Sequence, residues 1–204
     1  MLPDELLARP DLDRSTRLLA MALVAIWRGD WPALERTAAT GREDGMPRAQ
    51  FEETLLQAVL FCGFPRVVTA FETLAAAWPA AAAPGGGALP RDQQEAAGRA
   101  LFAAIYGRND ATVRAMLQGC HQEFHDFVLE AAYGRILCRP GMSPQLRELL
   151  AVAVLAAMGQ LRQFVAHARG ALHFGASRAQ LREVLVTALG DELAADDWLV
   201  RVRS

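Results

Sequence analysis

The stretch PQLRELLAVAVLAAMGQLRQFVAHARGALHFG, residues 144–175, has the pattern of two helices joined by a tight turn. Ser143 precedes Pro144, an order typical of a helix N-cap followed by the first helical residue. The apolar run that follows reaches Gly159, and glycine readily ends a helix. A second helical segment then runs to Gly175. This stretch predicts a helical hairpin.

The rest of the chain shows the same helical spacing. Phe51, Leu55, Ala58 and Val59 follow the i, i+4, i+7, i+8 rule, and no stretch alternates apolar and polar residues over the length of a strand. The sequence therefore predicts an all-α fold. The helices are expected near residues 14–28, 31–43, 47–61, 65–78, 92–107, 110–118, 121–134, 144–158, 161–174, 178–189 and 192–201.

One segment interrupts the helices. Between Pro79 and Pro90 the chain reads PAAAAPGGGALP, and its prolines and consecutive glycines favour a linker over a regular helix. We therefore expect an N-terminal helical repeat over 1–78, a linker over 79–91 and a C-terminal repeat over 92–204.

The two halves are similar to each other. GMPRAQFEETLLQA (45–58) matches GASRAQLREVLVTA (175–188) at seven of fourteen positions, and a shift of one residue overlays RLLAMALVAIW (17–27) on ELLAVAVLAAM (148–158). The pattern predicts a tandem repeat that folds as a helical bundle with pseudo-two-fold symmetry. With the shift, Arg17 and Arg36 (or Glu35) match Glu148 and His167, so the first copy is expected to lack that pair.

The composition limits the classes of function. Of 204 residues, 52% are hydrophobic and 22% charged, the net charge is about -2, and every basic residue is an arginine. No basic block is present, which disfavours nucleic-acid binding. The longest apolar runs are about half a membrane crossing and the N-terminus lacks a signal pattern, so we expect a cytoplasmic protein with no membrane partner. The three widely spaced cysteines indicate neither disulfides nor a zinc site.

Glu148 and His167 are the candidate catalytic residues. Glu148 lies eleven residues before the predicted turn and His167 eight after it, which places them roughly 17 and 12 Å from the turn at about 1.5 Å per residue. A carboxylate facing an imidazole holds one ring tautomer and raises its basicity, as an acid/base catalyst needs. The alternative is a glutamate that serves the helix dipole and a histidine satisfied in the core.

Residues 133–185 contain Arg139-Pro140-Gly141, Arg147-Glu148-Leu149, a histidine nineteen residues after the glutamate and a glycine-led helix from Gly175. With these features the segment resembles the carboxymuconolactone decarboxylase family. Residues 52–74, which contain Gly63-Phe64-Pro65, resemble the family segment that follows the histidine helix. Whether this first-half piece completes the second-half pocket stays open. The resemblance implies a tandem-repeat bundle of the alkylhydroperoxidase D-like type.

The peroxidase branch of this fold carries Cys-x-x-Cys before the histidine, whereas this chain has Gln160 and Gln163 there. Without that dithiol the resemblance implies the decarboxylase branch, a carboxy-lyase without cofactor or metal that acts on a small carboxylated lactone or related acid. His167 would donate the proton, and Glu148 would orient the imidazole ring. The expected substrate-binding residues are Arg139, Arg147, Arg162 and Tyr133, since arginine binds carboxylates bidentately.

Two other functions stay open at this stage. One is a non-catalytic, oligomeric helical protein that binds a small ligand, and the other is a family member with thiol-independent peroxidase-like activity. The resemblance implies a homo-oligomer, a trimer or hexamer, in each case. His121 and His125 share a helix face, but no distant third ligand accompanies them, so a metal site there is disfavoured.

Overall fold

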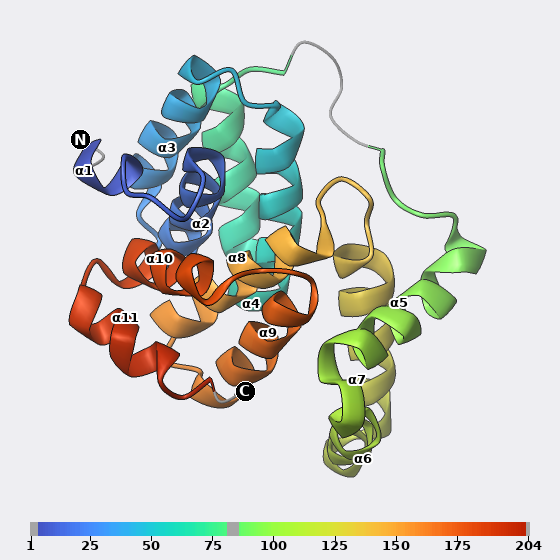
Figure 1. Ribbon diagram of the computed structural model, residues 1–204. Coiled ribbons are helices and arrows are strands. Elements are labelled where there is room, and N and C mark those ends of the chain that lie inside the picture. Colours follow the sequence, from blue (N-terminus) through green and yellow to red (C-terminus); the bar gives the residue numbers. More distant parts are fainter. Residues whose placement is uncertain (1–3, 81–85, 203–204) are drawn as a thin grey trace.

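The structure is a computed structural model that describes residues 4–80 and 86–202, and it confirms the all-α fold (Figure 1). Within these residues there is no strand. The elements are α1 (Asp4–Leu7), α2 (Arg14–Arg28), α3 (Trp31–Glu43), α4 (Arg48–Ala77), α5 (Arg91–Tyr106), the 3₁₀ turn η1 (Gly107–Asn109), α6 (Asp110–Cys120), α7 (Gln122–Phe127), the π-helix η2 (Val128–Leu137), α8 (Pro144–Ala157), α9 (Leu161–His173), α10 (Arg178–Leu189) and α11 (Glu192–Leu199).

The predicted hairpin is α8 and α9. The Ser143 hydroxyl accepts a hydrogen bond from the Leu146 backbone N–H at 3.2 Å, which caps α8. Gly159 ends the helix with φ 72°, a left-handed conformation that glycine adopts at no steric cost. Every residue of α8 from Arg147 to Ala156 is buried, so this helix lies at the centre of the molecule.

The two predicted helices 47–61 and 65–78 form one element, α4, which bends at Gly63 (φ 73°, ψ 168°), two residues before Pro65. By length and composition α4 is apolar enough to cross a membrane. The bend, however, divides it into two pieces that are each shorter than the roughly 20 residues a crossing requires. Its buried side chains, such as Phe51, Leu55 and Leu74, pack in the main core instead.

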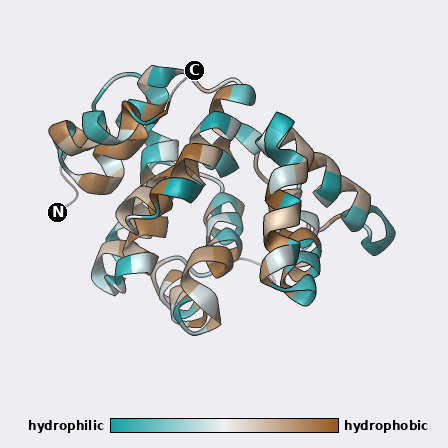
Figure 2. Cartoon of the chain, turned by 90° about the horizontal axis from the view of Figure 1, so that it is seen from below, coloured by the Kyte–Doolittle hydropathy of each residue, from teal (hydrophilic) through white to brown (hydrophobic). Residues whose placement is uncertain are grey.

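The helices form two groups with separate cores. The larger core takes side chains from α2, α3 and α4 and also from α8, α9 and α10, so both halves of the chain share it. A smaller core consists of Phe102, Ile105, Leu129, Tyr133 and Leu137, from α5 and η2. In Figure 1 this smaller group, α5 to η2, stands beside α9, and Figure 2 shows brown, hydrophobic stretches on helices of both groups.

The domain boundaries expected from the sequence divide the chain into segments, but the hydrophobic cores do not follow them. Residues 92–204 are not one compact repeat, because α8 packs against α2 and α10 while α5 and η2 form a layer of their own. Residues 79–80 and 86–90 of the expected linker are not helical. The rest of that linker, 81–85, lies outside the described residues.

Residues of the first half correspond structurally to residues 130 positions later in the second half. Asp13 and Ser143 cap α2 and α8, and Gly29 and Gly159 end these helices with φ 70° and 72°. The one-residue shift inferred from the sequence is therefore wrong. The residues equivalent to Glu148 and His167 are Leu18 and Thr37, not Arg17 and Arg36, because the alanine-rich helix allowed a displaced match.

Two buried ion pairs join the halves crosswise. Arg17 of α2 donates to Glu183 of α10 at 2.7 Å, and Arg147 of α8 donates to Glu53 of α4 at 2.6 Å. The partners in each pair again differ by 130 from those in the other. Arg9 and Arg139, also equivalent, add further hydrogen bonds to Glu183 and Glu53. Arg17 and Arg147 are almost fully buried, so their charges depend on these carboxylates.

The smaller group depends on a close contact between two glycines. A Cβ on Gly98 of α5 would meet the backbone N of Gly134 at 2.5 Å, and one on Gly134 would meet the Gln94 carbonyl oxygen at 2.8 Å. These contacts are with backbone, which cannot rotate away as a side chain can. The two glycines thus set the distance between α5 and η2.

Glu183→Gln is expected to lower the free energy of unfolding by about 3–5 kcal/mol, since it leaves the buried Arg17 guanidinium without a counter-ion. Urea denaturation followed by circular dichroism measures this change. The control is Glu192→Gln, because Glu192 is an exposed partner of Arg9 and its loss should hardly move the unfolding midpoint. Equal effects of the two variants would contradict the structural role of the buried pair.

Gly134→Ala is expected to destabilise the layer of α5 and η2 by about 1–3 kcal/mol, because the added methyl group overlaps backbone atoms. Gly119→Ala is the matched control, since a Cβ there meets nothing within 4 Å and alanine is the better helix former. Hydrogen exchange, read by mass spectrometry over residues 91–137, should show faster exchange in Gly134→Ala only. Unchanged protection would mean that the helices do not need this contact.

Candidate active site

Glu148 and His167 meet across the α8–α9 hairpin. The Glu148 Oε2 lies 2.9 Å from the His167 Nδ1, within hydrogen-bond distance. Both residues are buried. Gly170, one turn after His167, makes room for this contact, because a Cβ at that position would meet the Glu148 Oε2 at 2.5 Å. The predicted proximity of the two side chains is thus present in the structure.

The surroundings of the pair determine the charge on the histidine. Burial lowers the pKa of His167, but the charge and hydrogen bond of Glu148 oppose it and raise the pKa above its ordinary 6.5. The Glu148 carboxylate therefore extends the imidazolium form of His167 to higher pH than in a free histidine. The Nε2 has no hydrogen-bond partner among the described residues, and 10% of the side chain remains exposed. The ring is thus held at Nδ1, while Nε2 is not engaged by any described residue.

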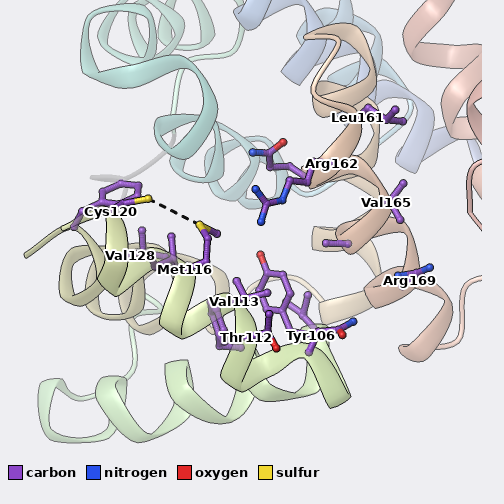
Figure 3. A pocket seen from close by; sticks show the side chains of 17 residues that line it. Tyr106, Thr112, Val113, Met116, Cys120, Val128, Leu161, Arg162, Val165 and Arg169 are labelled. Atoms are coloured by element: carbon purple, nitrogen blue, oxygen red, sulfur yellow. Dashed lines mark hydrogen bonds between the residues drawn. The ribbon is translucent and has the colours of Figure 1, made fainter. Parts of the chain in front are cut away.

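A pocket of about 880 Å³ lies between α9 and the smaller group of helices. The polar part of its wall includes Tyr106, Arg162, Gln163 and Arg169. Figure 3 shows the Arg162 side chain reaching into this space and the Tyr106 hydroxyl pointing toward it. His167 does not line the pocket itself; it lies behind a wall formed by its neighbours on α9.

Two hydrogen-bonded tyrosines lie at and behind the pocket wall, within the electrostatic influence of Glu148. The Tyr133 hydroxyl donates to the Tyr106 hydroxyl at 3.2 Å. Burial raises the pKa of both phenols, and the Glu148 carboxylate raises each further. Tyr133, the predicted pocket residue, is buried in the smaller core, and Tyr106 takes the place at the pocket wall. Tyr106 was missed; the sequence signal was its position at the helix end before Gly107, as one of only two tyrosines.

Of the three predicted arginines, Arg162 alone lines the pocket. Arg139 binds Glu53 at 2.7 Å and the Gly86 carbonyl at 2.6 Å. The Arg147 guanidinium binds Glu53, Gln57 and the Arg139 carbonyl. Both guanidinium groups are therefore engaged by Glu53, and neither lines the pocket. Consecutive residues of a helix point about 100° apart, so Arg147 faces α4 while Glu148 faces α9.

The first-half segment does not complete this pocket. Phe64, between Gly63 and Pro65, is 72% exposed and points to solvent, and none of the three lines the described pocket. Burial raises the pKa of the neighbouring Cys62 thiol to about 11, so the thiol stays protonated near neutral pH. His121 caps α7 through its Nδ1, and His125 pairs with Asp126.

Gly170→Ala is expected to displace the Glu148 carboxylate from His167 and to lower the pKa of the imidazole, because burial then acts without the opposing charge. In the native protein the raised pKa stabilises the fold below pH 6.5, and this contribution is lost as the pH rises through the folded-state pKa. An NMR titration of the His167 ring protons measures the pKa. Gly119→Ala is the control, and an unchanged pKa in Gly170→Ala would contradict the tight contact.

Comparison with known proteins identifies the family of the chain. A curated protein, the 4-carboxymuconolactone decarboxylase of Acinetobacter baylyi, is 30% identical over 70 residues, which are 34% of this chain and 52% of that protein. The chain thus spans about half the length of this relative. The model of the carboxymuconolactone decarboxylase family matches residues 2–77 and 122–194. Since these stretches cover more than half of the chain, the protein belongs to the carboxymuconolactone decarboxylase family.

Proposed function

We propose that this protein is a carboxy-lyase that releases CO₂ from a carboxylated lactone or related acid by acid/base catalysis. The observation that carries the proposal is the hydrogen bond between Glu148 and His167 beside a pocket whose wall contains Arg162. The pocket has cationic side chains and no aspartate or glutamate among its described lining residues. An anionic substrate is therefore favoured over a cationic one.

Each residue has a distinct task in this reaction. Arg162 holds the substrate carboxylate, since a guanidinium matches its planar geometry. As the bond to the carboxylate carbon breaks, CO₂ leaves and the electron pair moves into the conjugated lactone. His167, protonated at Nε2, then donates a proton to the substrate carbon, and it regains a proton from water. Glu148 stays ionised and positions the ring through Nδ1. This proton transfer requires the α9 residues between the pocket and His167 to move, so that the substrate reaches Nε2.

The two related halves of the chain, called here the first and the second unit, carry one acid/base site between them. Leu18 and Thr37, which are equivalent to Glu148 and His167, have no group that titrates near neutral pH. We propose that the first unit is a scaffold derived from the same repeat, and that its part is to supply Glu53 to the second unit. Assembly into a trimer or hexamer and a cytoplasmic location remain predictions.

A second function is favoured by one specific observation. His167 lies behind the pocket wall and keeps only 10% of its side chain exposed, which suits a protein that binds an acid without converting it. In that case Glu148 and His167 would stabilise the hairpin and take no part in turnover. The experiment below separates the two functions.

We expect the wild-type protein to release CO₂ from a member of a panel of carboxylated lactones and β-keto acids. His167→Ala should lower kcat by about 10²-fold or more, as the loss of a general acid does. His173→Ala, on the exposed end of the same helix, is the control. In a pH profile, kcat should decrease on the alkaline side, above pH 6.5, as His167 loses its proton. In Glu148→Gln this decrease should begin at lower pH, because the raised pKa of His167 depends on Glu148.

The same assay can reject the proposal. Turnover that survives in His167→Ala would remove the histidine from the mechanism. Binding of acids by the wild-type protein without any CO₂ release would establish the second function instead.

A further inference from the structure

One wall of the pocket comes from a segment that the family model does not match. Residues 78–121 lie between the two matched stretches. Nine of the pocket-lining residues, from Phe102 to Cys120, belong to this segment, on α5, η1 and α6. The chemistry of that wall is therefore a property of this chain rather than of the matched family segments.

The α6 part of this wall presents an apolar face. Val113, Met116 and Leu117 are spaced i, i+3, i+4 on α6, so they share one face of the helix, and that face lines the pocket. Phe124 and Val128 extend the apolar surface onto α7 and η2. In Figure 3 the labelled Val113, Met116 and Val128 lie on the side of the cavity opposite α9. An ionised group placed against these residues would lose its hydration without gaining a partner.

The opposite wall, on α9, carries the positive charge. Arg162 forms no salt bridge with any of the described residues, unlike Arg139 and Arg147. The Tyr106 hydroxyl points toward it across the pocket (Figure 3). A guanidinium and a phenol together can hold one carboxylate, since both donate hydrogen bonds. The pocket thus offers a site for an anionic group at Arg162 and Tyr106, and an apolar face along α6.

The size of the pocket also argues against a small ligand. Its volume of about 880 Å³ lies in the upper part of the roughly 300–1,000 Å³ range of ligand pockets. A single carboxylated lactone ring would fill only part of this space and would leave the face of α6 exposed to water.

We propose that the pocket takes an amphipathic monocarboxylate, with its anionic group at Arg162 and Tyr106 and an apolar chain or ring along Val113, Met116 and Leu117. That such an acid, a carboxylated lactone with an apolar substituent, is the substrate rests on the proposed function. That the pocket binds amphipathic monocarboxylates does not depend on the proposed function. A small dicarboxylate without an apolar body fits this pocket poorly.

Isothermal titration calorimetry with decanoate, below its micelle concentration, tests the proposal, and adipate serves as the small dicarboxylate. Decanoate should bind at one site per chain and adipate at least about tenfold more weakly, because adipate places a second charge against apolar residues. Val113→Asp should weaken decanoate binding by about tenfold or more for the same reason. Val68→Asp, on an exposed residue of α4 outside the described pockets, is the matched control.

Two further variants complete the test. Arg162→Gln should weaken decanoate binding, whereas Arg36→Gln on α3 should not. Met116→Gln, which keeps the side-chain length, replaces Val113→Asp if the latter loses its helical circular dichroism signal. Adipate binding as tight as decanoate binding, no decanoate binding, or equal effects of Val113→Asp and Val68→Asp would overturn the proposal.

The outcomes also separate the inference from the proposed function. One outcome is His167-dependent CO₂ release from small carboxylated lactones only, without decanoate binding. This outcome would support the lyase function and reject the proposed ligand class. Decanoate binding that His167→Ala preserves, without CO₂ release from any carboxylated lactone, would leave the ligand class and reject the lyase. If both hold, kcat/KM should rise as the apolar substituent of the lactone lengthens.

Discussion

The crossed ion pairs between the two units are the constraint on which the rest of the structure depends. Arg17 and Arg147 are buried, and neither has a carboxylate partner within its own unit. A buried guanidinium without a counter-ion is costly, so each unit needs the glutamate of the other. Removal of one unit would leave the other with an unpaired buried charge. This dependence fixes the central helices α2 and α8 against α10 and α4.

The same constraint positions the candidate active site. Arg147 and Glu148 are neighbours in sequence, and the helix turns them to different sides. With Arg147 held by Glu53, Glu148 is directed to α9, where Gly170 admits its carboxylate to the Nδ1 of His167. The first unit retains the ion pair but has Leu18 and Thr37 at the other two positions. The structural interaction is therefore present twice and the acid/base pair once.

The segment between the matched stretches gives the pocket its character. The family segments supply the hairpin with Glu148, His167 and Arg162, whereas α5 and α6 supply most of the apolar wall. The close contact of Gly98 with Gly134 holds α5 on η2, and Tyr106 and Tyr133 join this layer to the surroundings of Glu148. The Glu148–His167 pair and most of the apolar pocket wall thus come from different parts of the chain.

The sequence by itself determined the local features. Helical periodicity, the cap at Ser143, the glycine ends and the break at Gly63 follow from interactions within a few residues, and they give the all-α fold with helix bounds close to those observed. The nineteen-residue interval across a predicted hairpin also placed Glu148 and His167 at similar depth, because the depth of a residue in a hairpin depends on its distance from the turn. That the two side chains face each other depends on Gly170 and on the ion pair of Arg147 as well.

Tertiary structure alone decided what the arginines do and where the cores lie. Arg139, Arg147 and Arg162 are the same residue type near the same hairpin. Their surroundings differ because Glu53, 86 residues or more away in the chain, forms ion pairs with the first two. The burial of Tyr133 behind Tyr106 and the sharing of one core by both halves also depend on contacts between distant helices. Such contacts leave no periodic trace in the sequence, since either partner alone is an ordinary helical residue.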